Sequence, residues 1–161
     1  ITEACGISRM TFYYHFKDIY DLADWTLQEA LHAAIAENRT HDNWQQGFLN
    51  LLEALKAHQS LILNAYRAID RELVERYMRR EVEALLLPVV EEQAAGIKIS
   101  EKGKHRVAVF YAYAFMGVVM EWIQRNMAAS PQEVAATTAA MIHGDFRNSL
   151  ENMSRYEAKK A

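Results

Sequence analysis

Apolar residues recur along much of this chain at the three- and four-residue spacing of an amphipathic helix. One apolar stripe is formed by Trp44, Phe48, Leu51, Leu52 and Leu55, and a second by Val74, Met78, Val82, Leu85 and Val89. Each stripe lies on one side of a helix, so both segments are predicted to be helical. Pro88 lies in the second segment, and because proline has no backbone N–H, we expect it to kink or end that helix nearby.

A helix-start signal precedes the C-terminal part of the chain. Ser130 can cap a helix, Pro131 is tolerated at the first helical position, and Glu133 can complete a capping box. We therefore expect one helix from about Pro131 to Asn152.

Turn-forming residues separate the helical segments. Gly, Ser, Asn or Asp cluster at 38–43, 95–100 and 127–130. No segment keeps the two-residue alternation of a half-buried strand. The fold class is therefore predicted to be all-α, with about six to eight helices.

The segment 107–120, VAVFYAYAFMGVVM, is apolar on every side of the helical wheel, so a helix there must be covered all round. Its 14 residues are fewer than the ~20 needed to cross a bilayer, and no membrane partner is predicted. Small residues that would let a second helix approach are Ala108, Ala112, Ala114 and Gly117. A chain of this size covers about half of such a helix, which favours a homodimer over a central helix in a monomer.

Composition narrows the class of protein. The 161 residues are 51% hydrophobic and 24% charged with two prolines and six glycines, which excludes a large multidomain enzyme and a disordered or fibrous chain. The net charge of −3 means that any DNA contact must come from a local patch. Cys5 is the single cysteine, which fits a reducing cytoplasm. The chain begins at Ile1 within an apparent helix, so we expect that N-terminal sequence is missing.

Residues 1–22, ITEACGISRMTFYYHFKDIYDL, have the pattern of helix, tight turn and helix. Gly6 can adopt positive φ, Ile7 can plug the turn into a small core, and Ser8 can cap a helix from about Arg9 to His15. This short helix is rich in groups that contact phosphates and base edges. On spacing alone, a plain packing motif is an equally good interpretation.

The same stretch resembles the end of the DNA-binding domain of the TetR (tetracycline-repressor) family, whose pattern runs I-A-x-x-A-G-V-S-x-G-T-L-Y-x-H-F-x-S-K-E-x-L. Matching residues are Ile1, Gly6, Ser8, Thr11, Tyr13, His15, Phe16 and Leu22, with conservative variants at Ile7 and Phe12. The resemblance implies a truncated helix-turn-helix head with its connecting helix in 1–37. It also implies a helical-bundle domain for ligand binding and dimerisation in 38–161.

Roles follow from the resemblance by position. Ser8 would cap the recognition helix, Asp18 would cap the connecting helix, and Phe12 and Phe16 would face the small core. Candidate base contacts are Arg9, Met10 and Tyr14, and candidate phosphate contacts are Thr11, Tyr13, His15 and Lys17. Met10 replaces the family's usual glycine and can reach a thymine methyl group.

The resemblance also implies partners. Segments 101–127 and 131–152 would pair with their copies in a homodimer that binds a near-palindromic operator in double-stranded DNA. The segments 8–22, 66–78 and 110–123 further resemble a subset of dihydroxyacetone-kinase regulators. The effector would be a small molecule or a protein, and no cofactor is implied. A helical protein-interaction dimer without a small-molecule effector is the alternative.

An effector pocket is expected among the helices of the larger domain. Its candidate lining residues are Tyr66, Met78, Tyr111, Tyr113, Phe115, Met116, Glu121 and Trp122, although aromatic residues at helical spacing more often pack in a core. Glu121 follows the apolar run directly and is expected to be a buried carboxylate, which needs an arginine or a polar ligand as partner.

An enzyme is the remaining function class. Glu29 and His32 form one Glu-x-x-His pair, whereas a carboxylate-bridged di-metal site uses two such pairs and two more glutamates. The other histidines are scattered, and no GxSxG, P-loop or GxGxxG motif occurs. We therefore predict that the chain is not an enzyme and binds no metal.

Overall fold

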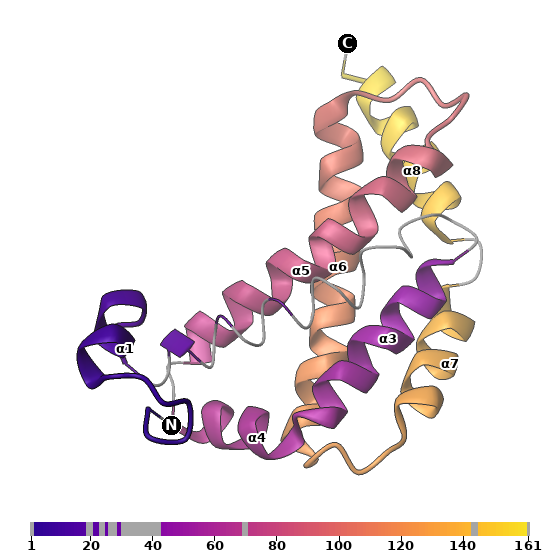
Figure 1. Cartoon of the computed structure of the whole chain (residues 1–161). Coiled ribbons are helices and arrows are strands. Elements are labelled where there is room, and N and C mark those ends of the chain that lie inside the picture. Colours follow the sequence, from indigo (N-terminus) through magenta and orange to yellow (C-terminus); the bar gives the residue numbers. More distant parts are fainter. Residues whose placement is uncertain are drawn as a thin grey trace.

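The computed structural model describes residues 2–18, 21, 22, 25, 29, 43–68, 71–142 and 145–160. The helices are α1 (Arg9–His15), α3 (Trp44–Ala57), α4 (Gln59–Ala68), α5 (Arg71–Gln93), α6 (Glu101–Gln124), α7 (Pro131–Ile142) and α8 (Asp145–Ala158). Helices are the only regular secondary structure in these ranges, so the predicted all-α fold class is confirmed. Figure 1 shows α1 at one end of the molecule, apart from α6, α7 and α8.

One hydrophobic core joins α3, α6 and α8. Phe115 of α6 packs edge-on against Trp44 and Phe48 of α3, with ring centroids 5.5 and 4.8 Å apart. Phe146 of α8 extends this cluster, 5.8 Å from Trp44 and 4.4 Å from Tyr111. The predicted stripe of α3 is confirmed, because all five of its residues are buried. Contacts between aromatic rings therefore hold together α3, α6 and α8, which are distant in sequence.

Helix α5 runs through Pro88 and ends at Gln93. We expected a kink or a nearby end, and the helix does not stop at the proline but continues for five residues beyond it. Leu85 and Leu86 before the proline, and Val89 and Val90 after it, are completely buried. This packing on both sides holds the helix in place despite the hydrogen bond that proline cannot donate. Of the predicted stripe, the side chains of Val74 and Met78 lie outside the described residues.

The predicted single helix from Pro131 to Asn152 is two helices, α7 and α8, and the second continues to Ala158. The start signal is confirmed, because the Ser130 Oγ accepts a hydrogen bond from the Glu133 N–H at 3.1 Å. Gly144 lies in the sequence between the two helices, and glycine is a poor helix former. The continuous apolar pattern hid this division.

Helix α6 has two different faces. Residues such as Ala108, Ala112, Phe115 and Val119 are completely buried, whereas 67% of Phe110 is exposed. Its length and hydropathy would suffice to cross a membrane, but half of that stretch is buried inside the protein. Much of the apolar run is therefore apolar because it lies in the core. The rest is exposed, as we expected for a chain that covers only part of this helix.

The start of α6 is tied to the end of α8. The Ser100 side chain caps α6 by accepting from the Gly103 N–H at 3.0 Å. Glu157 accepts in turn from the Ser100 N–H at 3.0 Å and from its hydroxyl at 2.6 Å. A Cβ at position 103 would lie 2.7 Å from Glu157 and from Ile99, so glycine allows this close approach. The C-terminal helix is therefore anchored by hydrogen bonds as well as by the core.

The turn after α6 contains two consecutive left-handed residues, Asn126 and Met127, with φ of 55° and 53°. The Met127 N–H donates to the Trp122 carbonyl at 2.8 Å, and the Met127 side chain is completely buried. Lys56 of α3 donates to the Met127 carbonyl at 2.7 Å. Tertiary contacts thus hold a backbone conformation that non-glycine residues rarely adopt.

Candidate nucleic-acid interface

The turn before α1 has the predicted conformation. Gly6 has φ of 64°, in the left-handed region that favours glycine. Ser8 caps α1, because its Oγ accepts from the Thr11 N–H at 3.0 Å and lies 2.9 Å from the Thr11 hydroxyl. Ile7 does not plug the turn as expected, since 42% of it is exposed. Local hydrogen bonds, rather than burial, therefore position the start of this helix.

None of the residues of α1 is buried, and its large side chains project from the protein. The exposed fractions are 82% for Met10, 66% for Tyr13 and 86% for Tyr14. The remaining candidate contacts on this segment are also exposed: Ser8, Arg9, Thr11, His15 and Lys17. A mixture of cation, hydroxyl and aromatic groups is therefore presented together, as contact with phosphates and base edges requires.

The opposite side of α1 has an aromatic contact surface. The Phe12 and Phe16 rings lie 5.8 Å apart, and Phe16 lies 6.0 Å from Trp25. Both phenylalanines are partly buried, in contrast to Tyr13 and Tyr14. The short helix is therefore two-sided, with Phe12 and Phe16 turned towards other aromatic rings and the tyrosines towards solvent.

The segment after α1 is closed by two aspartates. Asp18 accepts from the Asp21 N–H at 2.9 Å, as an N-cap residue does, and Asp21 accepts from the Lys17 N–H at 2.9 Å. This hydrogen bond agrees with the predicted capping role of Asp18. Asp18 and Asp21 thus add two negative charges to the segment that contains Lys17.

The candidate effector residues have different surroundings in the described part of the chain. Phe115 and Trp122 lie in the core, and the Trp122 indole donates to the Ala129 carbonyl at 2.9 Å. Tyr66 and Met116 are partly buried at the edge of the core, whereas 53% of Tyr113 is exposed. The Met78 side chain lies outside the described residues.

Tyr111 takes part in a contact between two helices. Its hydroxyl forms a 2.8 Å hydrogen bond with the Ser149 hydroxyl of α8. Burial raises the pKa of Tyr111 above its ordinary value, the Ser149 bond lowers it, and the charge of Asp145 raises it further. The hydroxyl therefore stays protonated and links α6 to α8.

The expectation of a buried carboxylate at Glu121 was wrong. Its side chain is 64% exposed and forms an ion pair with Arg125, one helical turn later, at 2.8 Å. Glu121 directly follows the apolar run, but it lies on the outer face of α6. Water and Arg125 solvate its charge, so it needs no buried partner.

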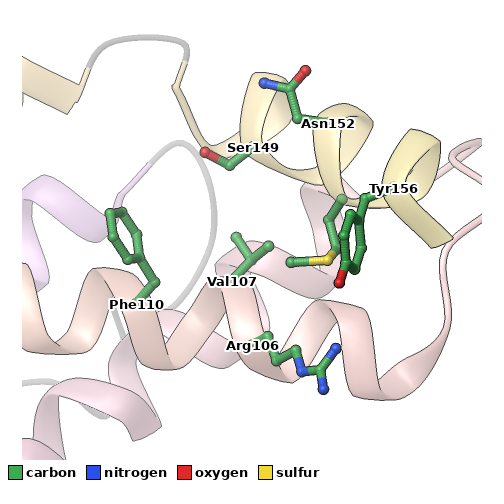
Figure 2. Close-up of a pocket in the computed structure, with 7 residues that line it drawn as sticks. Arg106, Val107, Phe110, Ser149, Asn152 and Tyr156 are labelled. Atoms are coloured by element: carbon green, nitrogen blue, oxygen red, sulfur yellow. The ribbon is translucent and has the colours of Figure 1, made fainter.

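An open groove lies between α6 and α8, with a volume of about 310 Å³ (Figure 2). It is lined by Arg106, Val107, Phe110, Ser149, Asn152, Met153 and Tyr156. Sequence reasoning missed these residues, because the helical pattern does not say which helix lies beside α6. The exposure of Phe110 at its mouth leaves an apolar surface on the outside of the protein.

The metal hypothesis gains no support from the described residues. Glu29 is exposed, and His32 lies outside them. In the parts of the chain that the structure describes, no three His, Cys, Asp or Glu side chains are grouped to hold a metal ion.

Comparison with known families identifies the larger part of the chain. The family model TetR_C_8, described as transcriptional regulator C-terminal region, matches residues 42–144. This match spans α3 to α7 and covers more than half of the sequence. No curated protein matches the chain.

Proposed function

Because this chain belongs to the TetR family of transcriptional regulators, we propose that it binds duplex DNA as a homodimer and responds to an effector through its larger domain. Residues 1–37 belong to the DNA-binding head and 38–161 to the body. The protein acts in the cytoplasm as a regulator rather than as an enzyme. The effector is a small molecule or a protein.

The observation that carries DNA binding is the outward presentation of α1. Arg9, Met10 and Tyr14 face base edges in the major groove, while Thr11 and Tyr13 contact phosphates beside His15 and Lys17. The exposure of all these residues supports this assignment. A seven-residue helix is short enough to enter the groove with most of its side chains.

Dimerisation sets the spacing of two such heads. The outer face of α6 and the segment 131–152, which comprises α7 and the first half of α8, pair with their copies. A two-fold axis then requires a near-palindromic operator, with recognition helices about 34–36 Å apart. An effector that prefers another spacing of the heads weakens DNA binding by its differential affinity for the two shapes.

Gel retardation with the DNA upstream of the gene tests this proposal. Full-length wild-type protein should retard the fragment at low salt, and the double variant Thr11→Ala, Tyr13→Ala should not. Leu61→Ala is the matched control, because Leu61 is an exposed apolar residue that lies on α4, outside both α1 and the segments proposed to dimerise. Its retardation should equal that of the wild type.

Two results would contradict the proposal. If the wild type retards no upstream fragment at low salt, the protein-interaction dimer becomes the better interpretation. If the α1 variant retards the fragment as strongly as the wild type, α1 is not the contact surface.

A further inference from the structure

The outer face of α6 is largely exposed, with Arg79 of α5 over the Tyr113 ring at 5.9 Å and α8 beside Arg106 and Phe110. It consists of Arg106, Phe110, Tyr113, Ala114, Gly117 and Glu121, all exposed. The spacing of these residues places them on one side of the helix. Phe110 and Tyr113 are 67% and 53% exposed, so this face leaves large aromatic groups in water.

Gly117 has no structural reason within its own subunit. A Cβ at this position would meet no atom within 4 Å, and its φ is not in the left-handed region. Glycine inside a helix is destabilising relative to alanine. Gly103 on the same helix differs, because its own subunit leaves no room for a Cβ. A side chain at 117 would therefore meet no described atom of its own subunit, so the space beside this glycine is open.

The face is complementary to itself when it is reversed. Positions 106 and 121, 110 and 117, and 113 and 114 are pairs with one common midpoint, between Tyr113 and Ala114. The first pair joins a cation with an anion, and the second joins a large ring with a glycine. Antiparallel pairing about this midpoint therefore matches charge with opposite charge and bulk with space.

We infer that a second copy of this chain packs its α6 antiparallel on this face, with the two-fold axis between Tyr113 and Ala114. Phe110 covers Gly117 of the partner subunit, and Arg106 meets Glu121 of the partner subunit at each end. At the axis, Tyr113 lies level with Ala114 of the partner subunit, and each of the two residues is one position from its own copy. This inference rests on the proposed homodimer and specifies its register.

The surroundings of the face fit a four-helix arrangement. The groove beside Phe110 is bounded by α8, so each subunit offers two adjacent helices to its copy. Glu121 is paired with exposed Arg125 within its own helix, and its second carboxylate oxygen can accept from the partner's Arg106. Helices in such bundles cross at about 20°, so they stay close enough to remain in contact from position 106 to position 121.

Disulfide cross-linking tests the register in full-length protein carrying Cys5→Ala. Ala114→Cys should give a covalent dimer under mild oxidation, because this residue lies next to its copy at the axis. Glu121→Cys is the control. The register places it 15 residues, or about 22 Å, along the helices from its copy, too far for a disulfide.

Charge reversal gives an independent readout by sedimentation equilibrium. Arg106→Glu and Glu121→Arg should each raise the dimer dissociation constant roughly tenfold or more, because like charges then face each other. The double variant should recover most of the wild-type affinity. Recovery must arise between subunits, since the double variant still lacks the internal Glu121–Arg125 pair.

The outcomes separate this register from the proposed function. A dimer that retards DNA but forms no Ala114→Cys cross-link, or whose double charge variant is weaker than either single one, overturns the register alone. A protein that cross-links at 114 but retards no DNA keeps the register and contradicts the proposed function. A protein that is monomeric at micromolar concentration overturns both.

Discussion

Helices α1 and α3 are both rich in aromatic residues but place them in opposite surroundings. Trp44 and Phe48 of α3 are 3% and 0% exposed, whereas Tyr13 and Tyr14 of α1 are 66% and 86% exposed. The spacing explains the difference. Aromatic residues four positions apart share one face, but consecutive ones point in different directions, and one packed face cannot bury them all. The exposed rings on this short helix are consistent with the proposed DNA contact.

Among the variants that test this difference, we expect the largest change in the free energy of unfolding at Phe48. Phe48→Ala should lower the free energy of unfolding by about 3–5 kcal/mol, because it leaves a cavity beside Phe115 in a completely buried core. Tyr14→Ala is the matched control and should change it by less than about 0.5 kcal/mol. Denaturant unfolding at equal protomer concentration measures both. A loss at Tyr14 as large as that at Phe48 would show that α1 is packed rather than presented.

A smaller effect is expected where α8 anchors the start of α6. Ser100→Ala removes the cap of α6 and should cost about 0.5–2 kcal/mol in the free energy of unfolding. This cap also involves Glu157, so it connects two helices. Ser8→Ala removes a similar cap from α1 but should leave the main unfolding transition of the body unchanged.

The same anchor predicts a pH dependence. Hydrogen bonds from Ser100 lower the pKa of Glu157 below its ordinary value of 4.5. The stabilisation is therefore present above pH 4.5 and is lost as the pH falls through the lowered pKa. The stability difference between wild type and Glu157→Gln should shrink below pH 4.5. A difference that stays constant down to pH 2 would contradict the role of the carboxylate.

The smallest expected change in stability distinguishes the buried Tyr111 from the exposed Tyr14. Tyr111→Phe removes the hydrogen bond to Ser149 and should cost roughly 0.5–1.5 kcal/mol in the free energy of unfolding. Tyr14→Phe removes a hydroxyl of a highly exposed side chain and should cost nothing measurable. Thermal unfolding of the two variants in parallel checks this. Equal losses would mean that the Tyr14 hydroxyl has a partner within the protein.

Local features were predictable because their determinants lie within a few residues. The stripe of α3, the cap at Ser8, the start signal at Ser130 and the left-handed Gly6 are all confirmed by the structure. Each depends on side-chain spacing or on backbone hydrogen bonds within one turn. The outward side of α1 followed from a family pattern of similar local length, although its contact with DNA remains a proposal.

Other features required knowledge of which helices become neighbours. Glu121 was expected to be buried because it follows an apolar run. The residues of α6 that face the core are on the other side of the helix, so Glu121 is exposed. The continuation of α5 through Pro88 depends on packing from both sides. Neither the neighbour of an apolar face nor the strength of its packing is encoded in periodicity.

The helical class, the caps at Ser8 and Ser130 and the groups presented on α1 can be read from the residues alone, since short-range sterics and hydrogen bonds decide these. Which half of the apolar α6 is core and which half faces outwards depends instead on how the helices pack. The same packing also decides that α8 anchors the start of α6 and forms the groove beside Phe110. The physical reason is that burial is non-directional: a hydrophobic face must be covered, but its composition does not specify what covers it.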